Sequence, residues 1–588
     1  MKIASVNLTD NVIEYTEVDD GVLTVLAGGR GLGVGLLERI GFKGGALEPR
    51  SPLIISLGPL IGTGFPLANR LTMVFRSPLT GTVAWAQTGG YAGYEMASLG
   101  LSAIIITGAA EKLSYLQVDV SGISIVEAGW LKGQGAVETC AQLRSRLGDV
   151  RVLSVGPAGE NLVKIATVIN DMGRSSGVRH GVGAILGSKN LKAIVFRGVR
   201  QMRRKPYDGT AFTQLLRKLQ LKLRQSHLLN HEQGLLSVHG TAIAAEAIGR
   251  CEALPVKNYR LTSHERYETV GGHAMSSTVL INRLTCSVCP VSCRRETVGM
   301  GVRSEGPDYA QISSLGTNCM LFNLEQISYL TYLCYDLGLD PIEMGNTLAV
   351  YAELSERGAV KDRPCWGDFN QMAQLITQTA NRSGVGAILG HGAHETARQF
   401  NMPDIAPSIK GISIQNADPR VEHAWGLLNA VESFGGAAHI WIYPRLIKSF
   451  QTFGINTIHD PSLADGVYAA QVRVAALDSL GVCAFSNLAF QDEEYIDGVK
   501  YFYGVKLEDD MLREIGMRIL AIERSLNESY GFDESSDILP KRFLEEPVPT
   551  GVNKGLVCPL RTLLREYRHI RRDPPISETL TLLPHFTS

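Results

Sequence analysis

The sequence has no excess of charge of either sign and no apolar run of membrane length. Lys and Arg total 57 and Asp and Glu total 58 among 588 residues, so the formal net charge is −1. A balanced surface creates no field that would attract a polyanion, which argues against nucleic acid as a partner. No apolar stretch reaches the ~18 residues that a membrane helix needs. We therefore expect neither nucleic-acid binding nor membrane insertion.

The sequence is also poor in cysteine, and its start does not resemble a targeting signal. Ten cysteines are too few for a disulfide framework in a chain of this length. The first residues, Met1–Asn7, lack the apolar core and the cleavage site of a signal peptide. Both observations indicate a reducing compartment, and we expect a cytoplasmic protein.

Short apolar and β-branched runs recur in the first 200 residues, and helical spacing follows. The runs are Leu53–Ser56, Leu71–Phe75, Ala103–Thr107, Val152–Val155 and Ala193–Phe196. Two helices are expected among them, at Val34–Ile40 and Gly135–Arg146. Apolar residues at helical spacing occupy the segments 209–228, 324–336, 342–357, 368–381 and 470–480. The pattern predicts an α+β protein with a β-rich N-terminal domain, packed as a sandwich or barrel, followed by two mainly α-helical domains.

The chain is too long for one core, and a prior of ~150 residues per domain predicts three or four domains. The basic stretch Arg200–Lys205 suggests one linker, and Ala406–Gly411 suggests a second. We therefore expect domains at 1–202, 203–408 and 409–588. The sequence shows no internal repeat.

Three of the cysteines fall within a short stretch, as Cys286, Cys289 and Cys293. A loop with this spacing can place three thiolates around an iron–sulfur cluster, and a distant residue can supply the fourth. Zinc is an alternative, although no second cysteine pair or histidine follows nearby. Purely structural thiols are a third interpretation. The adjacent Arg294 and Arg295 would offset the negative charge of a cluster.

Three glycine-rich stretches could direct backbone N–H groups at phosphate oxygens: Gly28–Gly33, Gly89–Gly93 and Gly177–Gly183. None is a dinucleotide fingerprint, since Val34 stands where a third glycine is needed. Tight turns in a sheet domain are the alternative interpretation of each stretch. Arginines beside two of them favour the phosphate interpretation.

Longer motifs identify a family. They are Gly58–Gly64, Ser77–Gly81, Gly89–Gly93, Gly156–Lys164, Leu186–Ala193 and Leu539–Pro547. Together they make the chain resemble, nearly end to end, the aldehyde ferredoxin oxidoreductase family of tungsten, less often molybdenum, pterin enzymes. The resemblance implies a tungsten (or molybdenum) bis-pyranopterin, Mg²⁺ bridging the pterin phosphates, and a 4Fe-4S cluster close to one pterin. It makes the N-terminal domain the pterin-binding one.

The family motif Asp-x-x-Gly-Leu-Cys corresponds to Asp478–Cys483. The resemblance therefore implies that Cys483 is the fourth cluster ligand and that Asp478 and Gly481 contact a pterin. An earlier copy of the motif is altered here, because Tyr335 stands at the usual Asp position. We expect Asp336 or Asp340, on either side of Gly338, to substitute for it.

Three further positions match the cofactor pattern of the family. Arg70 matches an arginine between cluster and pterin. Gln87 stands where the family usually has a magnesium-contacting Asn. Arg179 and Gly181 match the loop on the phosphate side, with one extra residue in this chain.

The resemblance also implies catalytic positions. His439 matches a histidine near the metal, where a satisfied core histidine is the alternative. The family sequence Gly-Pro-Glu-Tyr-Glu reads Gly306–Ala310 here, so Asp308 is kept as a carboxylate and Ala310 replaces the second Glu. A carboxylate there could activate water or accept a proton, and alanine can do neither.

The leading expectation is an oxidoreductase that acts on an aldehyde or other oxo group and passes electrons to ferredoxin or a ferredoxin-like subunit. Ala310 favours an alternative on the same cofactors, a low-potential reductase of an aromatic thioester or another substrate with an auxiliary electron-transfer subunit. A zinc-stapled binding protein is the non-enzyme alternative. Cys319, beside the expected pocket, is either a packed thiol or a ligand of the tungsten. Leu330 and Leu333 replace an interface metal pair of some relatives, which leaves open a homodimer held by packing.

Overall fold

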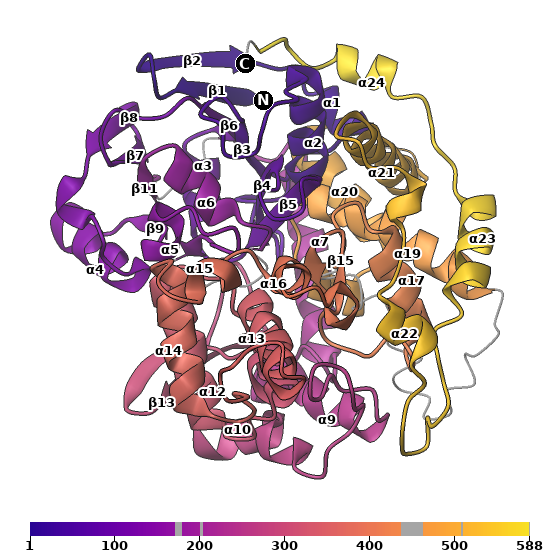
Figure 1. Ribbon diagram of the computed structural model, residues 1–588. Coiled ribbons are helices and arrows are strands. Elements are labelled where there is room, and N and C mark those ends of the chain that lie inside the picture. The colour runs from indigo at the N-terminus through magenta and orange to yellow at the C-terminus, as the bar shows by residue number, and fades with distance from the viewer. Residues whose placement is uncertain (171–178, 200–203, 437–461, 507, 509, 587–588) are drawn as a thin grey trace.

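The computed structural model describes residues 1–588 except 171–178, 200–203, 437–461, 507, 509 and 587–588. Sheets occupy the first 200 residues and helices dominate the remainder (Figure 1), which confirms the α+β class. The five predicted apolar runs are strands, with ends within two residues of the expected ones. These strands are β3 (Leu53–Leu57), β4 (Leu71–Arg76), β6 (Leu101–Thr107), β9 (Arg151–Ser154) and β11 (Leu191–Phe196).

A six-stranded sheet has the order β2-β1-β6-β3-β4-β5. Its other strands are β1 (Lys2–Asn7), β2 (Val12–Glu17) and β5 (Val83–Thr88). Strand β3 is buried along its whole length, as expected for a continuous apolar run covered on both faces. Helix α2 (Gly29–Ile40) packs against β3 and β4.

A second sheet has the order β10-β9-β11-β7-β8. It adds β7 (Ser114–Asp119), β8 (Gly122–Glu127) and β10 (Ile169–Asn170), and helix α4 (Ala136–Leu147) packs against β9. Strands β10, β9, β11, β7 and β8 have the same order and relative directions as β4, β3, β6, β1 and β2 of the first sheet. In each sheet a parallel pair, β1–β6 or β7–β11, lies beside an antiparallel pair, β3–β6 or β9–β11.

The N-terminal region is thus a topological repeat, although the sequence shows no internal repeat. Strand order depends on the spacing of apolar runs and turns, and very different residues satisfy the same spacing. This duplication is the one large feature of the fold that sequence reasoning missed.

The segments with helical spacing after residue 205 become helices. They include α7 (Gly209–Gln225), α12 (Leu324–Leu337), α13 (Pro341–Glu356), α14 (Phe369–Ala380) and α19 (Ser462–Leu480). The first four begin after Asp208, Asn323, Asp340 and Asp368, whose side chains accept backbone N–H groups of the first turn. Other helices of this half are α17 (His423–Val431), α20 (Asp492–Tyr503), α21 (Met511–Ser529) and α23 (Leu560–Ile570).

The turns after α12 and α19 meet the two sheets in the same way. Gly338 ends α12 with φ +77 and Gly481 ends α19 with φ +78, a left-handed conformation that glycine adopts without strain. A Cβ on Gly338 would lie 2.6 Å from the nitrogen of Gly156, and a Cβ on Gly58 would lie 2.1 Å from the nitrogen of Gly481. These close approaches require glycine on both sides of each contact.

The residue two positions after each glycine is held in an equivalent place. The backbone N–H of Asp340 donates to the carbonyl oxygen of Ile165, and that of Cys483 donates to the carbonyl oxygen of Leu67, each over 2.9 Å. The duplicated sheets therefore deliver a carboxylate and a thiol to matching positions.

The predicted domain boundaries at 202 and 408 stay a prediction. One buried cluster contains side chains from all three predicted ranges, such as Ile54, Leu348 and Leu477. In the described part of the chain, no helix combines the length and the apolar character needed to cross a bilayer.

Candidate active site

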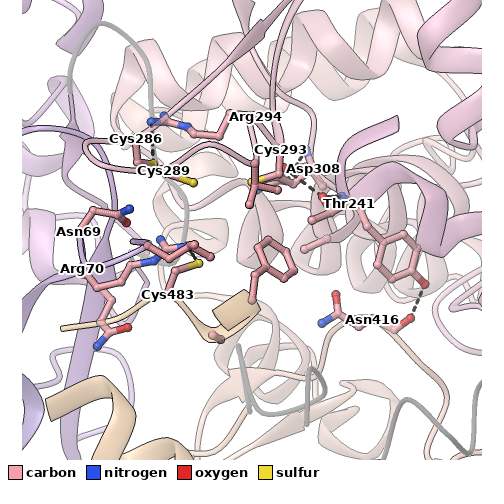
Figure 2. Close-up of a pocket in the computed structure, with 18 of the residues that line it drawn as sticks. Asn69, Arg70, Thr241, Cys286, Cys289, Cys293, Arg294, Asp308, Asn416 and Cys483 are labelled. Carbon is pink, nitrogen blue, oxygen red and sulfur yellow. Dashed lines mark hydrogen bonds between the residues drawn. The ribbon is translucent and has the colours of Figure 1, made fainter. Parts of the chain in front are cut away.

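Four cysteines line a single cavity of about 120 Å³. Cys286, Cys289 and Cys293 come from the loop between β12 (Leu280–Leu284) and β13 (Arg294–Gly299). Cys483 follows the turn after α19. Figure 2 shows Cys483 across the cavity from the three loop cysteines. The structure thus brings together the four residues predicted as cluster ligands.

Hydrogen bonds to the N-terminal domain anchor the cysteine loop. Ser287 donates its backbone N–H to the carbonyl oxygen of Gly90, and Leu67 donates its own to the carbonyl oxygen of Val288, each over 3.1 Å. The amide of Asn69 donates to the carbonyl oxygen of Ser287, also over 3.1 Å. The loop position is therefore fixed by contacts far away in sequence.

Gly89 makes room for one of the thiols. A Cβ at this position would lie 2.8 Å from Cys286 Sγ, which is too close for any side chain. The first glycine of the Gly89–Gly93 stretch is therefore required by packing against the cysteine loop.

The arrangement of the thiols suits a cluster. The four thiols line one shared cavity, which matches the four thiolate ligands of an iron–sulfur cluster. Desolvation and neighbouring thiolates raise the pKa of Cys289 to about 12 and the pKa of Cys293 well above its usual value. Thiolates here need cationic partners.

Two arginines supply that positive charge. Arg70 donates from Nη2 to Cys483 Sγ over 3.1 Å, and Arg294 donates from Nη1 to Cys286 Sγ over 3.7 Å. Desolvation alone would lower the pKa of Arg70, but the thiolates of Cys483 and Cys286 hold it above its usual range. Glu305 fixes Arg294 through a bidentate ion pair.

Arg179 and Gln87 line the same cavity as the thiols. The buried Arg179 guanidinium donates from Nε to Asp340 Oδ2 over 2.8 Å and from Nη2 to Glu343 Oε2 over 3.2 Å. Gln87 donates from Nε2 to Thr72 Oγ1 over 3.2 Å. Asp340 does not line the cavity itself but orients the Arg179 side chain, which does.

Gly181 forms the backbone turn that follows Arg179. It adopts φ +82 immediately before helix α6 (Val182–Ser188). A Cβ on Gly181 would lie 2.4 Å from the carbonyl oxygen of Lys164. Only glycine fits the turn that leads from Arg179 into α6.

The carboxylates of Asp478 and Asp336 are directed at neighbouring helices. Asp478 Oδ2 lies 3.3 Å from Nη1 of the buried Arg30, and burial raises the pKa of Asp478 to about 7 while Arg30 opposes the shift. Its carbonyl oxygen accepts a hydrogen bond from Gln87 over 3.4 Å. Asp336 Oδ1 accepts the backbone N–H of Val137 over 3.2 Å at the start of α4. Neither side chain lines the cavity, and their cofactor roles stay predictions.

Asp308 and Ala310 lie side by side in the cavity wall. Thr241 Oγ1 donates to Asp308 Oδ1 over 3.1 Å, and Asp308 forms a capping box with Gln311 at the start of α11 (Tyr309–Gln311). A π-helical turn, Ile312–Gly316, follows directly, a distortion that is frequent at functional sites. His439 lies outside the described residues.

Sequence reasoning missed several polar residues of the wall, chiefly Asn69, Thr241, Gln311 and Asn416. Asn69 Oδ1, Asn416 Oδ1 and Arg70 Nη1 are shielded from solvent and have no hydrogen-bond partner in the described part of the protein. Because buried polar groups are rarely left unpaired, these atoms indicate a polar ligand. The residues beside Asn416 and Thr241 in the sequence give no signal that would have identified them.

Cys319 does not line the cavity. It is buried and donates from Sγ to the carbonyl oxygens of Ser314 and Gly345, each over 3.2 Å. Burial raises its pKa well above the usual value. This geometry favours the packed thiol over a metal ligand.

Comparisons with known proteins agree with the motifs. The model of the aldehyde ferredoxin oxidoreductase N-terminal domain matches residues 3–198, and that of domains 2 and 3 matches residues 214–572. The tungsten-containing aldehyde ferredoxin oxidoreductase of Pyrococcus furiosus is 34% identical over 96% of this chain and 95% of that protein. The aliphatic sulfonate oxidoreductase, WOR-like subunit, of the same organism is 27% identical over 94% and 90%.

A solved structure shares the fold. It is the active-site complex BamBC of benzoyl coenzyme A reductase in complex with 1,5-dienoyl-CoA, with a TM-score of 0.82 at 20% identity. The match covers 99% of this chain and 96% of that one.

Proposed function

The chain belongs to the aldehyde ferredoxin oxidoreductase family, and we propose on this premise that it oxidises an aldehyde to a carboxylic acid at a tungsten–pterin centre. Cys286, Cys289, Cys293 and Cys483 would hold an iron–sulfur cluster, which would supply the electron route to ferredoxin. The observation that carries the proposal is the shared cavity, in which four thiols face the same space as unpaired polar groups and a carboxylate.

The residues present fit these groups. Four thiols match the four ligands of a 4Fe-4S cluster, and Arg70 and Arg294 offset its charge. Arg179 offers a guanidinium for phosphate, and the Gln87 side chain offers an amide oxygen for Mg²⁺. When bound, the metal–pterin group would supply the two-electron oxidation of a carbonyl carbon.

The chain itself orients the substrate and handles protons. Oxidation of an aldehyde with water releases two protons and two electrons. Asp308, positioned by Thr241, is the carboxylate that can take a proton from water. Asn416 and Tyr309 form a polar wall on the same side, because the Tyr309 hydroxyl donates to the carbonyl oxygen of Asn416. His439 remains a proposed second proton carrier.

A reductase of an aromatic thioester on the same cofactors is the second candidate. Ala310 in the cavity wall favours it, because the carboxylate expected at that position is missing. Cys319 gives it no support, since the thiol is turned into the protein interior. We also propose that the protein forms a homodimer and that its pterin metal is tungsten rather than molybdenum.

Metal and pterin analysis of anaerobically purified protein, followed by an aldehyde panel with a viologen dye, tests the function. We expect about four irons per chain, one tungsten with pterin, and dye reduction that depends on aldehyde. Protein loaded with tungsten and pterin that oxidises no aldehyde but reduces aromatic thioesters would favour the second candidate. Colourless protein with zinc would contradict both.

A further inference from the structure

Two histidine rings pack against each other in the helical half of the protein. His239 is the last residue of α8 (Leu235–His239), and His273 lies in the first turn of α10 (Gly272–Thr278). The ring centroids are 4.2 Å apart and the ring planes are tilted by 40°. Neither ring lines the cysteine cavity, and Figure 1 shows α10 at the lower edge of the molecule. The histidine pair is therefore separate from the site described above.

Hydrogen bonds place the ring proton of His239 on Nδ1. The Ser276 hydroxyl donates to the carbonyl oxygen of Gly272 over 2.9 Å, so its oxygen is left to accept from His239 Nδ1 at 2.9 Å. The carbonyl oxygen of Gly272, 3.3 Å from the same Nδ1, can only accept as well. Burial and the neighbouring His273 lower the pKa of His239, which keeps the ring neutral at pH 7. Nε2 of His239 therefore carries a lone pair.

A buried carboxylate orients the second ring in the same way. Glu246, in α9 (Ile243–Arg250), accepts at Oε2 from His273 Nδ1 over 2.7 Å and at Oε1 from the backbone N–H of His273 over 3.0 Å. Glu246 is buried, whereas the His273 side chain is 68% exposed. Nε2 of His273 is thus left with a lone pair on an exposed ring. In the described part of the protein, neither Nε2 atom has a hydrogen-bond partner.

His239 also has a rigid support. Arg295 donates to the carbonyl oxygens of the three residues before it, Leu236, Ser237 and Val238, over 3.2, 2.8 and 3.0 Å. A side chain on a backbone held in this way needs little rearrangement to bind a ligand.

We propose that His239 and His273 bind one divalent first-row transition-metal ion through their two Nε2 atoms. Imidazole nitrogen is a common ligand for Zn²⁺, Ni²⁺ and Cu²⁺. Metal-binding histidines almost always donate their other ring N–H to a carboxylate, a carbonyl oxygen or water, and Glu246 and Gly272 occupy those places here. Metal–nitrogen bonds of ~2.0 Å allow one ion to reach two rings packed this closely.

The two imidazoles are the whole protein contribution to this site. No group of three or more His, Cys, Asp or Glu side chains suited to a metal ion occurs among the described residues, so water fills the remaining coordination positions. The site uses no residue of the cysteine cavity and does not depend on the proposed function.

The test titrates Ni²⁺ into cluster-loaded protein that carries no histidine tag, in an anaerobic calorimeter. The cluster keeps the four cavity thiols occupied. We expect one Ni²⁺ per chain in wild type and none in the His239→Gln/His273→Gln double variant. Glu246→Gln should weaken binding by about tenfold or more, because the carboxylate that orients His273 is lost. Lowering the pH to about 5.5 should also weaken binding, since a protonated imidazole cannot hold a metal.

Two controls separate binding at the pair from other effects. His569→Gln removes an exposed histidine on α23 and should leave the Ni²⁺ affinity unchanged. The Tm of each variant without Ni²⁺ should equal that of wild type, which shows that the fold is kept. Failure of wild type to bind, wild-type affinity in the double variant, or two ions per chain at separate rings would each overturn the proposal. Because no aldehyde takes part, a failure of aldehyde oxidation contradicts the proposed function alone.

Discussion

Arg70 and Cys483 form a direct contact between a guanidinium and a thiol of the cavity wall, with Nη2 donating to Sγ over 3.1 Å. The other terminal nitrogen, Nη1, faces the cavity without a partner in the described residues. One side chain therefore touches the thiol and offers a free donor to whatever occupies the cavity. If the four cysteines hold a cluster, Arg70 would set the positive charge beside it.

Arg70→Gln should make the reduction potential of the cluster more negative. The substitution removes a positive charge and a hydrogen bond from the sulfur, and both stabilise the reduced cluster. We expect a shift on the order of tens of millivolts, measured by a redox titration followed by electron paramagnetic resonance. Arg70→Lys keeps the charge and should recover much of the shift. An unchanged potential in the Gln variant would show that the contact does not tune the cluster.

Cys483→Ser should lower the iron content and bleach the visible absorbance. Serine keeps the size of the side chain but is a poor ligand for iron in a cluster held by four thiolates. Cys140→Ser is the matched control, because Cys140 is buried in α4 and does not line the cavity. Iron analysis of both variants decides the assignment, and equal iron loss in the two would contradict it.

Asp308→Asn should slow aldehyde oxidation at unchanged iron and tungsten content. The amide keeps the hydrogen bond from Thr241 Oγ1 but cannot accept a proton, so kcat should fall by about 100-fold. Thr241→Val removes the hydrogen bond that positions the carboxylate, and should lower kcat less than Asp308→Asn does.

Ala310→Glu addresses the neighbouring position. If the reaction is aldehyde oxidation supported by Asp308 alone, a second carboxylate beside it should change kcat on aldehydes by less than tenfold. A large gain of aldehyde activity, measured beside an aromatic thioester, would instead indicate that the present chain evolved toward another substrate.

Glu422 should make the protein less stable as the pH rises. Its carboxyl is buried, Oε1 has no hydrogen-bond partner in the described part of the chain, and burial raises its pKa to about 7. The folded protein therefore holds one more proton here than the unfolded chain between roughly pH 4.5 and 7. The free energy of unfolding falls as the pH rises through that window, by up to about 3 kcal/mol.

The check is the Tm of wild type and Glu422→Gln at pH 5 and pH 8. The wild-type Tm should fall between the two values, and the Gln variant should fall less because it cannot ionise. Equal falls would mean that other groups cause the pH dependence.

Much of this architecture could be predicted because apolar spacing and capping residues act locally. Runs such as Leu53–Ser56 became strands, and Asp340 and Asp368 start the helices that the spacing indicated. The cysteine spacing indicated a cluster for the same reason, since three of the predicted ligands share one loop. These features need only neighbours in sequence.

The remainder depends on contacts between distant segments. Asn416 and Thr241 reach the cavity through folding of loops far from the cysteines, and nothing in their immediate sequence indicates that arrangement. The duplication of the sheet was missed because the two sheets share their strand order but not their residues. The cofactor roles of Asp336 and Asp478 were predicted from the motif alone. In the structure, Asp336 accepts a backbone N–H at the start of α4, and Asp478 pairs with Arg30 at the start of α2.

The duplicated sheets have a consequence for how a bound group is oriented. A scaffold with two equivalent halves would accept a pseudo-symmetric guest in either of two orientations. Here the matching positions end in different atoms, a sulfur at Cys483 and a carboxylate at Asp340, and Asp340 is already neutralised by Arg179. We expect this chemical difference between the two halves to give a bound group a single orientation.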